Sequence, residues 1–200
     1  MSPASVPTRR VGRPARYQPE ELLALVTAEF IARGYDATSM EDIARATGLT
    51  KSSIYHHVSG KEQLLRLAVQ RAVDALFAVL DEPHPGPPVR RLEHVIRRAA
   101  EVLVAELPYV TLLLRVRGNT DTERWALKRR RELDDRLAAL VRAAVDDGDV
   151  RADLDPRLVT RLLFGMVNSV VEWYRPDGRT SSRDVVDALV LLAFQGLRET

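Results

Sequence analysis

The chain has 200 residues, of which 46% are hydrophobic and 29% are charged, and this composition excludes a disordered or fibrous protein. It contains no cysteine, so disulfides, thiolate metal sites and cysteine nucleophiles are excluded, and nothing argues for an oxidising compartment. The formal net charge is only +2, and the sequence offers neither a signal peptide nor a membrane-spanning run, so we expect a cytoplasmic protein without a membrane partner.

Residues 1–18 form a basic, proline-containing arm. It carries Arg9, Arg10, Arg13 and Arg16 and no acidic side chain. A basic arm of this kind is typical of segments that contact phosphate, although a merely solubilising tail is the alternative.

The rest of the sequence has the periodicity of α-helices, because apolar residues recur three and four apart and alternating β-branched runs are missing. We therefore expect an all-α fold of about nine helices. The first four are expected from Pro19 to Gly34, from after Thr38 or Ser39 to Gly48, from Thr50 or Lys51 to about His57, and from Lys61 to the proline-rich run 81–88. Five more are expected at about 89–106, 108–117, 122–147, 155–175 and 182–198.

The start of the second helix offers two competing capping boxes. Thr38 has Glu41 three residues on, and Ser39 has Asp42 at the same spacing. A capping box pairs a hydroxyl with a carboxylate at this spacing, and the Glu-containing box is the stronger expectation.

The second and third helices, joined by a turn at Gly48, have the spacing of a helix-turn-helix. The exposed face of the third helix carries hydroxyl, ammonium, phenol and imidazole groups, which can contact phosphates and base edges. These groups belong to Thr50, Lys51, Ser52, Ser53, Tyr55 and His56. A half-buried role in the core is the alternative for Tyr55, and the adjacent histidines point about 100° apart, so they do not predict a metal site.

Several fragments of this region together resemble the N-terminal signature of TetR-family repressors. They are Gly34-Tyr35, Thr38-Ser39-Met40, Asp42-Ile43-Ala44, Gly48-Leu49, Ser53 to Val58, and Lys61 to Leu65. The resemblance implies a three-helix DNA-binding domain at residues 19–65, followed by a helical-bundle domain for ligand binding and dimerisation at residues 66–200.

The same resemblance implies roles for individual residues on double-stranded operator DNA. Thr38 or Ser39, Tyr55 and Lys61 would contact phosphates, while Thr50 to Ser53 and His56 would lie near base edges. Arg13, followed by Pro14, is best placed to follow a narrow minor groove.

The last two expected helices are rich in apolar residues. Leu158, Leu162 and Met166 on one, and Val185, Leu189 and Leu192 on the other, give more apolar surface than one face of a bundle requires. A central position within the monomer is the alternative, but the family pattern pairs these two helices into a homodimer interface.

Arginines gather where the seventh helix begins. Its inward stripe passes through Arg129, Arg130 and Trp125, and Arg115 precedes the Gly118-Asn119 turn. Such a cluster favours an anionic effector, whereas a solvated helix end neutralised by nearby acidic residues is the alternative.

This part of the chain is similar to the sensing domain of TetR regulators that respond to acyl-coenzyme A thioesters. The similarity lies in Thr111 to Asn119, the arginine-rich start of the seventh helix, and the segment from Asn168 to Pro176. It implies that the arginines bind coenzyme A phosphates near Asn119, and that Trp125, Phe164, Asn168 and Trp173 border the acyl pocket. For Phe164 and Met166, the latter also at this border, core packing is the favoured role.

These observations predict a dimeric DNA-binding repressor that leaves a palindromic operator when a small molecule binds. An enzyme is not expected, because the sequence has no glycine-rich phosphate loop, nucleophile elbow or His-Glu metal motif, and no cofactor is expected either. The alternative is an architectural DNA-binding protein without an effector, which a sealed C-terminal core would favour. An open pocket lined by the neighbourhoods of Arg115 and Arg129 would instead favour the ligand-responsive protein.

Overall fold

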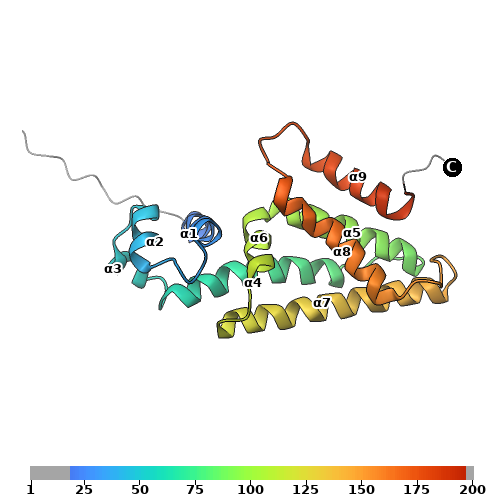
Figure 1. Ribbon diagram of the computed structural model, residues 1–200, viewed down its shortest axis with the longest axis horizontal. Coiled ribbons are helices and arrows are strands. Elements are labelled where there is room, and N and C mark those ends of the chain that lie inside the picture. The colour runs from blue at the N-terminus through green and yellow to red at the C-terminus, as the bar shows by residue number, and fades with distance from the viewer. Residues whose placement is uncertain (1–18, 197–200) are drawn as a thin grey trace, which may run out of the picture.

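A computed structural model describes residues 19–196, and within this range the chain forms nine helices and no strand (Figure 1). This confirms the all-α expectation. The helices are α1 (Pro19–Arg33), α2 (Met40–Thr47), α3 (Lys51–Tyr55), α4 (Lys61–Asp81), α5 (Pro88–Ala105), α6 (Leu107–Arg115), α7 (Asp121–Asp146), α8 (Pro156–Trp173) and α9 (Ser182–Phe194).

The cap of α2 corrects the expected capping box. Ser39 is the N-cap residue: its hydroxyl accepts the Asp42 N–H, and the Asp42 carboxylate accepts the Ser39 N–H. Thr38 instead donates its hydroxyl hydrogen to the carbonyl of Gly34 at 2.8 Å. Thr38 thus closes the end of α1, and Ser39 is left to start α2.

The turn between α2 and α3 depends on Gly48. This residue has φ of 66°, in the left-handed region that L side chains rarely adopt, and its N–H donates to the carbonyl of Arg45. Thr50 then caps α3 by accepting the N–H of Ser53. The third helix is shorter than the expected span to His57, because the chain leaves the helix after Tyr55 through a turn that buries Val58.

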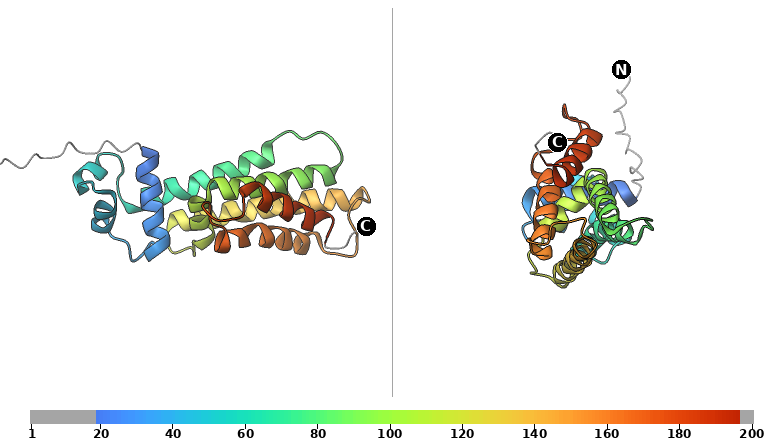
Figure 2. Two further views of the ribbon diagram at one scale, coloured as in Figure 1. Left: turned by 90° about the horizontal axis from the view of Figure 1, so that it is seen from above. Right: turned by 90° about the vertical axis from the view of Figure 1, so that its right-hand side faces the viewer.

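Helix α4 connects the N-terminal helices to the rest of the molecule. It runs without a break from Lys61 to Asp81, so the boundary expected at residues 65/66 lies inside a helix. Figure 2 shows α1–α3 at one end of an elongated molecule and the bundle at the other, with α4 extending between them.

Helix α5 is the centre of the C-terminal bundle. Its buried residues include the adjacent pairs Val95-Ile96 and Ala99-Ala100, and neighbours on a helix point about 100° apart. Helix α5 is therefore buried around much of its circumference, and it packs against α4, α6, α7, α8 and α9. Helix α9 ends at Phe194, short of the expected residue 198, with Gly196 at φ of 80° two residues later.

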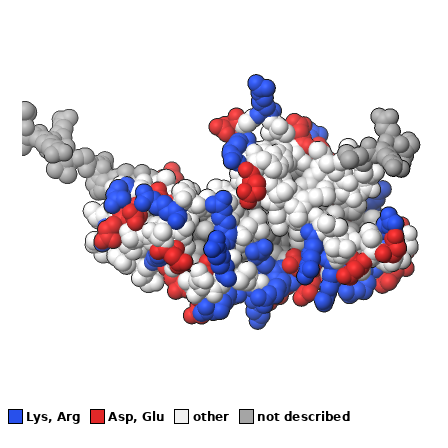
Figure 3. Space-filling model, viewed as in Figure 1, with Lys and Arg blue, Asp and Glu red and all other residues white. Residues whose placement is uncertain are grey.

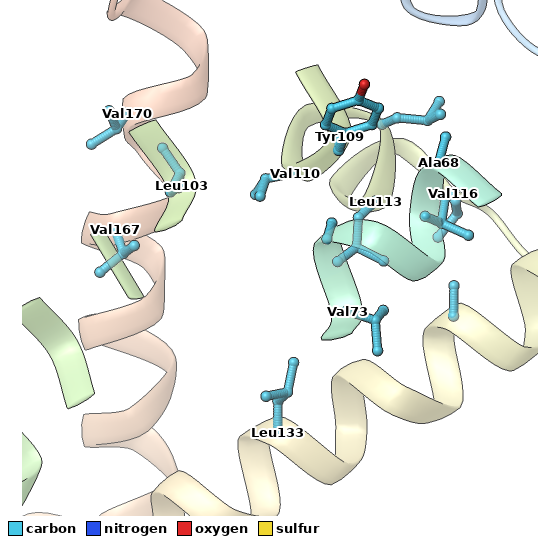
Figure 4. Close-up of a cluster of buried hydrophobic side chains, with 14 of the residues drawn as sticks. Ala68, Val73, Leu103, Tyr109, Val110, Leu113, Val116, Leu133, Val167 and Val170 are labelled. Carbon is cyan, nitrogen blue, oxygen red and sulfur yellow. The ribbon is translucent and has the colours of Figure 1, made fainter. Parts of the chain in front are cut away.

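Side chains from four helices meet inside the bundle. Figure 4 shows Leu103 of α5, Leu113 of α6, Leu133 of α7 and Val167 of α8 as members of one buried apolar cluster. All four are at most 5% exposed. No helix in the described range 19–196 has the length and apolar character needed to cross a membrane.

Candidate DNA-binding surface and effector cavity

Helix α3 presents a polar face supported by a buried apolar one. Ile54 is fully buried beneath the helix, while Lys51, Ser52 and His56 are exposed and Tyr55 is 51% exposed. Ser53 is partly buried. An exposed phenol on a helix of a helix-turn-helix is available to a phosphate, so the half-buried core role considered for Tyr55 is wrong.

The structure separates the two hydroxyls that the sequence offered as phosphate contacts. Thr38 is 1% exposed and bonded to the carbonyl of Gly34, so its side chain is not accessible to DNA, and this expectation is corrected. Ser39 is exposed at the start of α2.

Two expected cation contacts already have partners within the chain. Lys51 forms an ion pair with Glu41 of α2. The Lys61 ammonium donates to the carbonyl of Tyr35 at 2.8 Å and lies 4.3 Å from the centre of the Tyr35 ring, so it fastens the α1–α2 loop to α4. Arg13 lies outside the described residues.

The end of α6 is bonded directly to the DNA-binding helices. The Arg115 guanidinium donates to the carbonyl of Ile31 in α1 at 2.9 Å, and the Asn119 side chain donates to the Asp36 carboxylate at 3.3 Å. We call residues 115–123 the α6–α7 corner. Both residues were expected to bind an effector, and the structure instead places them where the two domains meet.

Two carboxylates secure this corner. Glu62 of α4 accepts the N–H of Thr122 at 3.2 Å. Glu123, which is 6% exposed, accepts the backbone N–H groups of Arg117, Asn119 and Thr120. Burial, followed by the negative charges of Glu62, Asp36 and Glu123, raises the pKa of Tyr35 to about 12, so the phenol beside the corner keeps its proton.

Two more residues expected in the effector pocket pack against α4. The Arg66 guanidinium lies 3.4 Å from the centre of the Trp125 ring, and Arg129 stacks on Phe77 at 3.6 Å while pairing with Glu132. Both contacts join α7 to α4. A cation over an aromatic face is stabilised by the ring quadrupole, which gives these side chains a structural role in this conformation.

A cavity of about 50 Å³ lies among α4, α5, α6, α7 and α8. Its apolar walls come from Leu76, Ala99, Leu103, Val110, Leu113, Leu114, Leu133, Phe164 and Val167. Arg130, Asp134 and Asn168 are its polar lining. Figure 4 shows the walls contributed by Val110, Leu113 and Leu133.

The cavity contains three of the eight residues expected to bind an effector, namely Arg130, Phe164 and Asn168. The neighbourhoods of Arg115 and Arg129 do supply part of its lining, namely Leu113, Leu114 and Arg130, but the Arg115 and Arg129 side chains do not line it, because other parts of the chain hold them. Trp173 does not line it either; it is 54% exposed beside Tyr174.

Asp134 was missed as a cavity residue, although its position one helical turn after Arg130 is a signal for it. Partial burial raises the pKa of the Asp134 carboxyl group, and Asp135 adds to this, while Arg130 and Arg161 oppose it. Arg130 of α7 and Arg161 of α8 therefore both act electrostatically on this carboxyl group.

The outer surface of α8 and α9 is apolar. Leu158 and Leu162 of α8 are 48% and 60% exposed, and Leu191 and Leu192 of α9 are 50% and 42% exposed. Figure 3 shows a broad area without charged residues over these helices, whereas Lys and Arg gather along the opposite edge of the view, over α7. Large exposed apolar patches mark interaction surfaces in soluble proteins.

Two protein-family models match the sequence. The model described as bacterial regulatory proteins, tetR family, matches residues 22–68. The model described as tetracyclin repressor-like, C-terminal domain, matches residues 85–197. The first contains the helix-turn-helix, and the second contains α5 to α9.

Three regulators are similar to this protein over most of its length. The HTH-type transcriptional repressor KstR2 of Mycolicibacterium smegmatis is 28% identical over 199 residues, covering 90% of this chain and 91% of that protein. The crystal structure of SCO3833, a TetR-family member from Streptomyces coelicolor A3, has a TM-score of 0.85 and 62% identity, covering 90% and 92% of the two chains. The structure of AibR with isovaleryl coenzyme A and operator DNA has a TM-score of 0.73 and 27% identity, covering 88% and 97%.

Proposed function

Because the chain belongs to the TetR family of bacterial transcriptional regulators, we propose that it represses transcription as a dimer on a palindromic operator and leaves that operator when an acyl-coenzyme A thioester binds. The protein is a transcriptional regulator rather than an enzyme. One observation carries the proposal: a cavity in the C-terminal bundle is walled by α6, the helix whose end is bonded to the DNA-binding helices.

The operator-binding surface is the exposed face of α3 together with the start of α2. Ser52 and His56 face base edges in this proposal, and Ser39 and Tyr55 face phosphates. Lys51 exchanges its partner Glu41 for DNA, since an exposed ion pair is worth little and a phosphate competes for the ammonium. Thr50 and Ser53 support α3 through its cap.

Dimerisation through α8 and α9 accounts for their exposed leucines. Leu158, Leu162 and Leu191 leave about half of their surface exposed in the monomer, and a two-fold dimer would bury them against the same surface of a second copy. Two helix-turn-helix domains related by a two-fold axis match the two half-sites of a palindromic operator.

Two observations support an acyl-coenzyme A thioester as the effector. The cavity walls are apolar, with polar side chains on one side, which suits an acyl group attached to a polar carrier. AibR, whose fold is similar over 88% of this chain, binds isovaleryl coenzyme A.

The cavity must widen to admit an acyl group, because its volume of about 50 Å³ is far below the roughly 300 Å³ at which ligand pockets begin. A ligand that binds only the widened conformation shifts the population toward it. Leu113 and Leu114 of α6 form part of the wall, and Arg115 follows them in the same helix, so displacement of α6 moves its bond to α1. Helix α4, which enters both domains, turns with it.

Fluorescence anisotropy on a labelled duplex from the DNA flanking the gene tests the proposal. At fixed salt, the protein should bind this duplex far more tightly than a scrambled duplex of equal length, and a thioester should weaken that binding. Free coenzyme A and the free acids are the controls for the carrier and the acyl group. Tight binding that no thioester alters would rule out the proposed effector and favour the architectural alternative.

A further inference from the structure

The effector cavity has an opening between α7 and α8. Its walls from α5 and α6 are mostly buried: Leu103 and Leu113, for example, are each 1% exposed. Asp134 of α7 is the cavity residue most exposed to solvent, although its carboxyl group is partly enclosed, and Asn168 of α8 lines the same cavity. A residue that both lines the cavity and is open to solvent marks its entrance.

Three donor side chains at or beside this entrance are unoccupied: Arg130 and Asn168 line the cavity, and Arg161 lies two helical turns before Asn168 on the same face of α8. Within residues 19–196, Arg130, Arg161 and Asn168 make no side-chain hydrogen bond or ion pair within 4.0 Å. The neighbouring arginines differ, since Arg129 pairs with Glu132 and Arg136 pairs with Asp81.

The charges of Arg130 and Arg161 converge on Asp134. Both guanidinium groups act electrostatically on its carboxyl group, one from α7 and the other from α8. The entrance therefore combines the guanidinium group of Arg130, the carboxylate of Asp134 and the guanidinium group of Arg161, which lies one turn before the cavity residue Phe164 on α8, and the apolar cavity lies behind them.

We propose, on the basis of the function proposed above, that the effector enters between α7 and α8 with its anionic part on Arg130 and Arg161, and that Asp134 weakens the binding of that anion. The effector class is thus an apolar body joined to a negatively charged head. Asp134 partly neutralises the two guanidinium groups while the site is empty, and an incoming anion has to displace or tolerate that carboxylate. A neutral ligand of the same shape meets neither the attraction of the arginines nor the repulsion of Asp134.

Isothermal titration calorimetry with the full chain tests this inference. The probes are isovaleryl-, butyryl-, octanoyl- and benzoyl-coenzyme A, and the tightest probe for the unmodified chain is carried through the variants. Asp134→Asn should tighten binding by roughly twofold to fivefold, as expected for removal of one exposed repulsive charge. Arg161→Gln should weaken it by roughly threefold to tenfold.

Asp135→Asn is the matched control, because it removes the same charge from the next residue, which does not line the cavity. Its effect should be clearly smaller than that of Asp134→Asn, and thermal unfolding checks that each variant folds. Suppose that a thioester releases the operator but that Asp134→Asn and Asp135→Asn bind this thioester with equal affinity. The proposed entrance between α7 and α8 is then wrong, and the proposed function stands. If no thioester binds the unmodified chain or releases the operator, the proposed effector and the entrance are both wrong.

Discussion

At the scale of single residues, Glu123 shows how one buried carboxylate organises a loop. It accepts three backbone N–H groups of the α6–α7 corner, and Thr120 returns a hydrogen bond by accepting the Glu123 N–H. Hydrogen bonds to a charged acceptor are stronger than neutral ones, and donors left unpaired after truncation lose that energy.

Glu123→Ala should therefore lower the free energy of unfolding by about 2 to 3 kcal/mol. Urea denaturation followed by circular dichroism measures the change. Glu132→Ala is the control, because Glu132 forms a surface ion pair with Arg129 and its loss should cost less than about 1 kcal/mol. Equal effects of the two variants would contradict a special role for Glu123.

Asp42 gives a prediction for pH dependence. Its hydrogen bonds from the Ser39 hydroxyl and backbone N–H, followed by the effects of Arg45 and Arg33, lower its pKa from 3.8 to about 2. A carboxylate with a lowered pKa in the folded state stabilises the fold above its unfolded pKa, and this contribution is lost as the pH falls through the folded value.

The stability difference between the unmodified chain and Asp42→Asn should therefore be constant above about pH 5 and should shrink between about pH 4 and pH 2. Urea midpoints measured at several pH values give this difference directly. Asp74→Asn, at an exposed aspartate of α4, is the control. A difference for Asp42→Asn that does not change with pH would show that its carboxylate is not stabilised by the α2 cap.

At the scale of helices, the end of α6 connects the cavity to the DNA-binding domain. Leu113 and Leu114 line the cavity, and the next residue, Arg115, donates to the carbonyl of Ile31 at the end of α1. Helix α6 thus touches both the cavity and the DNA-binding helices, and α4, which supplies Leu76 to the cavity and begins at Lys61, is a second connection between them.

Arg115→Ala should leave thioester affinity nearly unchanged and reduce the thioester-induced loss of operator affinity by roughly threefold to tenfold. Calorimetry measures the first quantity and anisotropy the second. Arg124→Ala is the control, since Arg124 donates to the carbonyls of Gly118 and Asn119 in the same corner without contacting α1. Full release of DNA by the Arg115 variant would show that coupling runs through α4 alone.

At the scale of the whole molecule, the exposed leucines of α8 and α9 determine the expected assembly. Leu162→Asp should convert the proposed dimer into a monomer, because it places a charge at the most exposed leucine of the apolar surface without disturbing the monomer core. Operator affinity should fall on the order of a hundredfold once the two DNA-binding domains are no longer joined in one dimer.

Light scattering coupled to size-exclusion chromatography measures the assembly, and anisotropy measures the affinity. Leu67→Asp is the control for oligomeric state, because Leu67 is 43% exposed but lies on α4. A Leu162 variant that stays dimeric would place the interface elsewhere.

The sequence by itself determined the helices and the helix-turn-helix, because these depend on residues close in the chain. The apolar periodicity gave the helical elements, Gly48 supplied the left-handed turn, and Thr50 capped α3. The wrong prediction of a Thr38 cap was also a local matter, because two neighbouring hydroxyls competed to cap α2. Thr38 is buried and bonds to the carbonyl of Gly34, so Ser39 caps the helix.

Only the tertiary structure decided which arginines are free for an effector. Arg115 and Arg129 look equivalent to Arg130 in the sequence, but Arg115 finds a carbonyl 84 residues away and Arg129 finds the ring of Phe77. Arg130 finds no such partner and lines the cavity together with Asp134, on whose carboxyl group Arg161 of α8 acts electrostatically. A side chain's partners across a bundle depend on how its helices pack, and the spacing of residues along one helix does not contain that information.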